Sequence, residues 1–245
     1  MKQNIYDNET FFIGYSKIRE NENNANNLFE KPALFSLLPD LKNKTVLDLG
    51  CGYGENCVSF VEKGAKRVVG IDISKKMLAV AKEKNSRRSI TYMNMPMENI
   101  GELNDRFDIV VSSLAFHYVE DFTALIKNIH GLLNENGVLV FSQEHPLVTC
   151  FSSGNRWTKN EDGEKLFANI ANYSVDGERE STWFVENVKK FHRTFSTIIN
   201  TLVVSGFMVK ELIEPVPTKK TLNDHPEYKD LLHRPDFLLI KAVRM

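Results

Sequence analysis

Three alternating glycines near residue 50 are the residues whose type and spacing point most directly to chemistry. The segment 46–54 reads VLDLGCGYG, in which a short apolar run predicts a strand, and a helical pattern begins after Gly54. Because glycine lacks a Cβ, such a turn can adopt positive φ and let backbone N–H groups approach a nucleotide-like ligand. The segment therefore predicts a turn that holds a cofactor.

A carboxylate follows the next apolar run, about twenty residues further along. The segment 68–73 reads VVGIDI and places Asp72 near its end. In doubly wound sheets an acid at this position accepts hydrogen bonds from ribose hydroxyls. A dinucleotide fingerprint, G-x-G-x-x-G, would need its third glycine where the chain has Glu55, and that carboxylate would repel a diphosphate. A ligand that carries ammonium and sulfonium groups meets no such repulsion.

These features resemble a known family. The sequence from Asp48 to Gly54 follows the pattern D-x-G-x-G-x-G and resembles motif I of the class I S-adenosylmethionine-dependent methyltransferases. Asp72 matches the acid that ends the second strand of that family. The segment 107–121, FDIVVSSLAFHYVED, is similar to the family's fourth-strand motif, and the tail pattern 190–215 resembles the small-molecule "type 11" group.

The resemblance covers residues 30–143 firmly and residues 183–244 more loosely. It implies S-adenosylmethionine as the cofactor and methyl transfer to an oxygen or nitrogen atom of a small molecule by in-line displacement. By analogy, Met97 offers a backbone N–H to adenine, Glu98 accepts from the exocyclic amine, and Tyr15 closes over the cofactor. The full set of cofactor-binding residues implied in this way is Tyr15, Asp48, Gly50, Cys51, Gly52, Gly54, Asp72, Ile73, Met77, Met97, Glu98, Ser113 and Leu114.

Three histidines are candidates for a general base, which is useful when the acceptor atom loses a proton. His117 follows the predicted fourth strand and His145 follows the fifth, at the edge where open α/β sheets bind ligands. Pro146 imposes an extended exit that would direct His145 toward this edge. His192 lies on the apolar stripe of a predicted helix over 188–204, where a structural role competes with a catalytic one.

The elements that must position these residues alternate between strands and helices, which is typical of an α/β fold. This pattern and the resemblance predict a Rossmann-like, doubly wound, mostly parallel sheet of seven strands with an antiparallel last strand. Predicted strands cover residues 45–49, 66–71, 90–93, 107–112, 138–142, 207–213 and 237–243. Predicted helices cover residues 55–62, a segment capped by Ser74, and residues 122–133 and 188–204, with a proline-containing loop over 214–235.

A chain of 245 residues is expected to form a single domain. We expect an N-terminal helical cap over residues 1–43, a cofactor-binding core over 44–143, and a C-terminal helix with two strands over 185–245. Residues 144–184 break the alternation and combine polar residues with several aromatic side chains. Long loops in compact domains are usually lids or binding segments, so we predict a substrate-side lid here, after the fifth strand.

The composition narrows the classes of partner. The chain has 31 Lys and Arg against 32 Asp and Glu, without a basic block, which disfavours nucleic acid. It shows neither a signal-peptide pattern at the N-terminus nor a run of about eighteen apolar residues, so we expect a cytoplasmic protein without a membrane partner. Its three cysteines and six histidines form no ligand cluster, so no metal is expected. The acceptor and the oligomeric state stay open.

Three alternatives deserve comparison. A non-catalytic S-adenosylmethionine-binding module would share the turn and the acid, because a fold does not prove a reaction. A nicotinamide-dependent oxidoreductase is disfavoured by Glu55 in place of the third glycine. An amino-directed nucleic-acid methyltransferase would carry N-P-P-Y or D-P-P-Y after the fourth strand, whereas residues 113–116 of this chain read SLAF.

Overall fold

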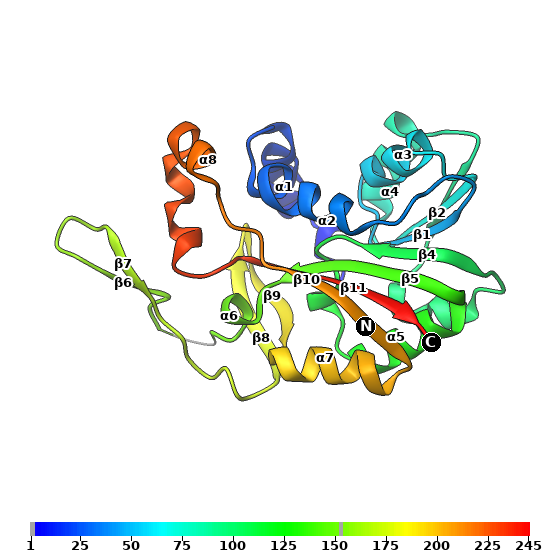
Figure 1. Ribbon diagram of the computed structural model, residues 1–245. Coiled ribbons are helices and arrows are strands. Elements are labelled where there is room, and N and C mark those ends of the chain that lie inside the picture. The colour runs from blue at the N-terminus through cyan, green and yellow to red at the C-terminus, as the bar shows by residue number, and fades with distance from the viewer. Residues whose placement is uncertain (1–2, 152–153) are drawn as a thin grey trace.

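A seven-stranded sheet forms the centre of the molecule (Figure 1). The computed structural model describes residues 3–151 and 154–245; residues 1–2 and 152–153, which fall in the expected cap and the expected insertion, lie outside the described part. The strands lie in the order β10-β11-β5-β4-β1-β2-β3, with the bounds β1 Thr45–Leu49, β2 Arg67–Asp72, β3 Ile90–Asn94, β4 Phe107–Ser112, β5 Leu133–Glu144, β10 Phe207–Ile213 and β11 Phe237–Arg244.

The direction of the strands confirms the predicted sheet. β11 pairs antiparallel with β5 and with β10, while β1, β2, β3, β4 and β5 pair in parallel. The chain moves outward from β1 to β3 and then returns to β4 on the other side of β1. The carboxyl ends of β1 and β4 therefore form the topological switch point, which is where open α/β sheets bind ligands.

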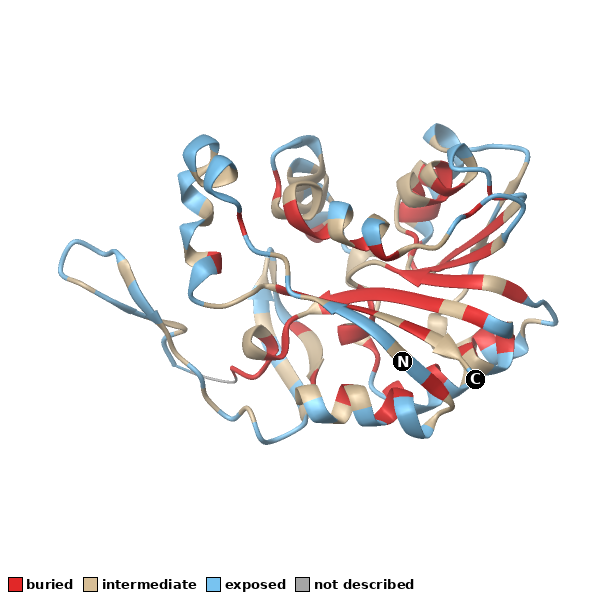
Figure 2. Ribbon diagram, in the orientation of Figure 1, coloured by how far each residue is buried: buried red, intermediate tan, exposed pale blue. Residues whose placement is uncertain are grey.

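Helices cover both faces of the sheet, so its central strands are buried on both sides and consist of nearly continuous apolar runs. In β1 every residue after Thr45 is buried, and Figure 2 shows the buried strands between the two helical layers. One layer contains α2 (Lys31–Leu37), α3 (Glu55–Glu62) and α4 (Lys75–Lys84), and the other contains η3 (Met97–Glu102), α5 (Phe122–Leu132) and α7 (Phe195–Val204).

Capping residues determine where two of these helices begin. The Ser74 hydroxyl accepts the backbone N–H of Met77 at 3.1 Å, which confirms the predicted cap of α4. Asp121 Oδ1 accepts the N–H of Ala124 at 2.8 Å and starts α5. The start of α4 therefore follows directly on the carboxyl end of β2, beside the switch point.

The chain before β1 is mostly helical. It forms η1 (Ile5–Asp7), α1 (Glu9–Glu20) and η2 (Asn26–Glu30), and η2 is a π-helix that continues into α2. π-Helical turns are rare, and those that occur are often found at functional sites. Across the described ranges, the helices are too short or too polar to cross a membrane.

The segment between β5 and α7 contains a short helix and two hairpins. α6 spans Pro146–Thr149; the first hairpin pairs β6 (Trp157–Lys159) with β7 (Lys165–Ala168), and the second pairs β8 (Gly177–Trp183) with β9 (Val185–His192). In Figure 1 the first hairpin extends away from the sheet, while the second lies next to α6.

Two predictions for this half of the chain are wrong. Residues 185–192 form the strand β9, so the helix predicted over 188–204 begins only at Phe195. Val188 and His192 are spaced by four residues, which fits a strand as well as a helix because four is a multiple of the strand period of two. The predicted loop over 214–235 contains two short helices, α8 (Lys219–Asp224) and η5 (Pro226–Leu232).

Candidate functional site

The turn after β1 approaches the end of β2 closely. The backbone N–H groups of Gly50 and Cys51 both donate to the carbonyl oxygen of Ile71 at 2.9 Å. Gly50 and Gly52 have φ values of 73° and 52°, which favour glycine. A Cβ on Gly50 would lie 2.7 Å from the Cβ of Ala115, whereas a Cβ on Gly52 would meet no atom within 4 Å. Gly52 therefore presents its backbone to open space.

The carboxylate of Asp72 is tied to this turn. Its Oδ2 accepts the N–H of Gly52 at 2.9 Å, and its Oδ1 accepts the N–H of Ser74 at 2.8 Å. Burial raises the pKa of Asp72, and the two N–H groups oppose this shift by stabilising the carboxylate. Each carboxylate oxygen keeps lone pairs that could accept from a ligand hydroxyl.

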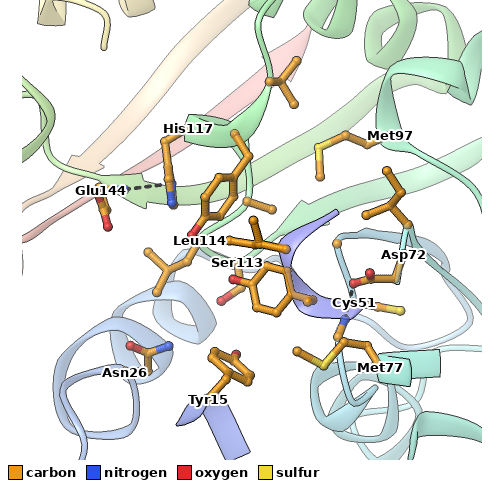
Figure 3. Close-up of a pocket in the computed structure, with 18 of the residues that line it drawn as sticks. Tyr15, Asn26, Cys51, Asp72, Met77, Met97, Ser113, Leu114, His117 and Glu144 are labelled. Atoms are coloured by element: carbon orange, nitrogen blue, oxygen red, sulfur yellow. Dashed lines mark hydrogen bonds between the residues drawn. The ribbon is translucent and has the colours of Figure 1, made fainter. Parts of the chain in front are cut away.

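A cavity of about 850 Å³ lies at the carboxyl ends of the strands. In Figure 3 Asp72, Cys51 and Met97 lie on one side of it, and His117 and Glu144 lie on the other. Most residues of the expected cofactor set line this cavity: Tyr15, Gly50, Cys51, Gly52, Asp72, Ile73, Met77, Met97, Glu98, Ser113 and Leu114.

Two residues of that set, Asp48 and Gly54, are absent from the cavity wall. Asp48 is 1% exposed and accepts a hydrogen bond from the Cys57 thiol at 3.2 Å. Burial raises the pKa of Asp48 to about 7. Gly54 is the N-cap of α3, and the Tyr92 side chain occupies the space that a Cβ would need. Both residues therefore support the turn from behind.

His117 lines the cavity on the side away from Asp72. Burial lowers the pKa of His117 to about 4, so its ring is neutral at pH 7. Nδ1 accepts the backbone N–H of Glu144 at 3.3 Å, which leaves the proton on Nε2 and makes that atom a hydrogen-bond donor. Lys190 Nζ donates to Glu144 Oε1 at 2.6 Å. Burial opposes ionisation of Glu144, but the charge of Lys190 and its hydrogen bond stabilise the carboxylate, and the pKa of Glu144 is lowered.

The other two histidines do not line this cavity. His145 Nδ1 accepts the N–H of Leu147 at 3.1 Å and thereby caps α6, while its Nε2 lies 2.8 Å from Glu214 Oε1. His192 Nδ1 lies 2.9 Å from the Thr149 hydroxyl, and its Nε2 lies 2.9 Å from a backbone carbonyl oxygen. Both ring nitrogens of each side chain are therefore engaged outside the cavity.

Sequence patterns missed several residues of the cavity wall. Tyr6 lies with its ring centroid 5.2 Å from that of Tyr15 and 6.2 Å from that of Tyr118, and Tyr15 lies 6.3 Å from Trp183. Burial raises the pKa of Tyr15 to about 12, so its hydroxyl stays protonated at pH 7. The buried carboxyl of Glu30 also lines the cavity. The contacts in this wall join segments that lie far apart in the chain, so no local pattern predicts them. The sequence showed only that these segments are rich in aromatic residues.

Comparisons with known proteins agree with this geometry. A family model described as "Methyltransferase domain" matches residues 47–141. An uncharacterized protein of Haemophilus influenzae is 41% identical over 251 residues, covering 100% of this chain and 98% of that protein. The structure of a putative S-adenosylmethionine-dependent methyltransferase from Listeria monocytogenes is 40% identical, with a TM-score of 0.81, covering 88% of this chain and 96% of that one. An S-adenosylmethionine-dependent methyltransferase from Mesorhizobium loti is 38% identical, with the same TM-score, over 88% and 97%.

The curated relatives whose names state a methyl acceptor are matched over less than half of their own length. The likeness to S-adenosylmethionine-dependent methyltransferases covers most of this chain and most of each matched chain. It supports a methyltransferase over the nicotinamide-dependent and non-catalytic alternatives. The match over residues 47–141 contains the glycine turn, Asp72 and His117. The chain belongs to the class I S-adenosylmethionine-dependent methyltransferases of the type 11 group, and S-adenosylmethionine is its cofactor.

Proposed function

We propose that the protein transfers the methyl group of S-adenosylmethionine to an oxygen or nitrogen atom of a small molecule in the cytoplasm. The observation that carries this proposal is the cavity of about 850 Å³, a volume typical of sites for small ligands. The wall of the cavity combines the residues expected to bind the cofactor with a second set, around His117 and Glu144. The cavity therefore has a side for each of two ligands.

The residues on the first side fit the cofactor. The open space above Gly52 lets a ligand approach the backbone, and we propose that Asp72 accepts the ribose hydroxyls. Met97 and Glu98 are proposed to contact adenine, as the family resemblance implies. When bound, S-adenosylmethionine supplies a methyl group on a positively charged sulfur. The cavity wall then has to hold the acceptor atom in line with that methyl.

The second side is suited to orienting an acceptor. The Nε2–H of neutral His117 can donate to an oxygen or nitrogen atom of the acceptor, and Tyr118 lies with its ring centroid 4.3 Å from that of His117. Holding two reactants at near-attack distance can supply roughly 7–11 kcal/mol of the barrier. We propose that these two side chains contribute chiefly through this alignment.

We further propose that the N-terminal cap and the insertion after β5 together exclude water from the cavity. Phe11 of α1 lies with its ring centroid 5.1 Å from that of Trp183 at the end of β8. The side-chain amide of Gln3 both donates to and accepts from the backbone of Lys189 in β9, at 3.1 and 2.8 Å. These contacts join the N-terminal cap to the second hairpin, and the two segments together form the proposed lid.

The proposal predicts methyl transfer into small molecules. The purified protein would be incubated with methyl-tritiated S-adenosylmethionine and a bacterial extract separated into small-molecule, protein and RNA fractions. We expect the label in the small-molecule fraction, with an equal amount of S-adenosylhomocysteine, and no label without extract. Label only in the protein or RNA fraction, or no S-adenosylhomocysteine at all, would contradict the proposal.

A further inference from the structure

Glu30, the last residue of the π-helix η2, places a buried carboxyl at the cavity. The residue is 2% exposed. Its Oε1 accepts the hydroxyl of Ser113 at 2.9 Å and also the hydroxyl of Ser142. The Ser142 oxygen in turn accepts the N–H of Leu114 at 2.9 Å, which leaves its own proton for Glu30. Within the described ranges, both hydrogen bonds end on Oε1 and Oε2 receives none.

The position of these serines puts Glu30 between the two sides of the cavity, because Ser113 belongs to the expected cofactor set and Ser142 does not. Ser113 follows β4 and Ser142 lies in β5, whereas the residues expected to bind the nucleoside follow β1, β2 and β3 on the other side of the switch point. Figure 3 shows Asn26, at the start of η2, on the same side as Glu144. A carboxyl at this position can reach an acceptor that extends from His117 toward Ser113.

His117 is poorly suited to accept a proton in this arrangement. Its Nδ1 is engaged by the N–H of Glu144, and its Nε2 already carries the ring proton. The carboxylate of Glu144 is held by Lys190 at 2.6 Å. Glu144 Oε2 likewise receives no hydrogen bond in the described part of the chain, but the pKa of Glu144 is lowered, which makes it a weak base. Among the described residues of the cavity wall, Glu30 is the carboxyl that is buried, and its Oε2 has no donor.

We propose that the Glu30 carboxylate acts as the general base that accepts the proton lost by the acceptor atom. This inference rests on the proposed function and requires an acceptor with a hydroxyl or N–H group. As the bond from the acceptor atom to the methyl carbon forms, the carbon–sulfur bond of the donor breaks, and its electron pair stays on sulfur. The proton passes to Glu30 and later to solvent, so S-adenosylhomocysteine and a methylated acceptor are the products.

The surroundings of Glu30 suit this role. Burial raises the pKa of its carboxyl, while the hydrogen bonds from Ser142 and Ser113 and the charges of Arg19 and Lys31 oppose that shift. The negative charge of Glu30 adds to burial in raising the pKa of Asp48, which lies behind the glycine turn. A general base works best when its pKa lies near the working pH, and a raised carboxyl approaches that condition.

The test compares Glu30→Gln with the wild type, using the labelled extract assay and then the acceptor purified from it. Glutamine keeps an oxygen for the two serine hydroxyls but cannot take up the proton. We expect kcat to fall at least a hundredfold, with the Kd for S-adenosylmethionine by calorimetry and the Tm changed little. The wild-type kcat should rise with pH and level off above the pKa of Glu30, and this rise should be absent in the variant. Glu135→Gln, an exposed change at the opposite end of β5, is the matched control.

A second variant keeps the proposal testable if Glu30→Gln fails to fold. Ser142→Ala retains the carboxyl and removes one donor to its ionised form, so the rise of kcat should move to higher pH. An unchanged kcat and pH profile in Glu30→Gln would overturn the inference alone. So would a tenfold weaker affinity for S-adenosylmethionine with unchanged kcat at saturation, because Glu30 would then bind the donor. No methyl transfer by the wild type would overturn the proposed function, and the role of Glu30 with it.

Discussion

Asp72 connects the glycine turn to the start of α4 through its two carboxylate oxygens, which bind the N–H groups of Gly52 and Ser74. The sequence indicated an acid that faces a ribose. The structure adds that the same carboxylate fixes the backbone of the turn. Loss of this side chain should therefore weaken cofactor binding in two ways, by removing a ligand and by releasing Gly52.

We predict that Asp72→Ala raises the Kd for S-adenosylmethionine at least tenfold, a loss of about 1.4 kcal/mol. Isothermal titration calorimetry of the folded variant measures this directly. Asp105→Ala is the control, because Asp105 is an exposed carboxylate that pairs with Arg67 at the amino end of β4. Equal affinity in the two variants would contradict the role given to Asp72.

Single residues differed in how well the sequence revealed them. Asp72 and the glycines belong to a local pattern, so their place could be predicted. Glu30 has no motif of its own, and the serines that hold it lie 83 and 112 residues away in the chain. His145 follows β5 as predicted, but its ring turns to cap α6 and to meet Glu214, a contact across 69 residues that no local pattern shows.

At the scale of elements, the turn between β1 and α3 depends on backbone shape more than on side chains. Both glycines line the cavity, but a Cβ on Gly50 would collide with Ala115, whereas a Cβ on Gly52 would point into open space. The same kind of substitution should therefore act differently at the two positions. At Gly50 a side chain would disturb the packing, and at Gly52 it would occupy the space for the cofactor.

We predict that Gly52→Val also weakens S-adenosylmethionine binding at least tenfold. Gly163 offers a matched control in the first hairpin, because it has a φ of 83° and a Cβ there would also meet no atom within 4 Å. Valine should cost about 1–2 kcal/mol of backbone strain at either glycine. Calorimetry should show a loss of affinity for S-adenosylmethionine in Gly52→Val but not in Gly163→Val. An equal loss in the two variants would mean that backbone strain, and not the lost space for the cofactor, causes the effect.

The elements of the core were predictable because apolar runs and capping residues act locally. The second hairpin was not. Side chains alternate along β9, so Val188, Lys190 and His192 lie on one face of the strand. From this face Lys190 donates a hydrogen bond to Glu144. A helix was predicted because Val188, Phe191, His192 and Phe195 also match helical spacing. Pairing with β8, which local spacing does not encode, decides between the two.

At the scale of the whole molecule, the doubly wound sheet brings three distant segments to one cavity. The N-terminal helices supply Tyr15 and Glu30, the strand ends supply the turn and Asp72, and the second hairpin supplies Trp183. The doubly wound, mostly parallel sheet with its antiparallel last strand could be predicted from the alternation of elements and the family resemblance. The enclosure of the cavity could not, because it depends on contacts such as Phe11 with Trp183 across the length of the chain.

A structure of the protein crystallised with S-adenosylhomocysteine tests the central claim most directly. We predict that the ribose hydroxyls lie within hydrogen-bond distance of the Asp72 carboxylate and that the backbone of Gly52 contacts the ligand. The sulfur should lie near Ser113, between the Asp72 side and the His117 side of the cavity. A ligand bound elsewhere, or a ribose turned away from Asp72, would contradict the account.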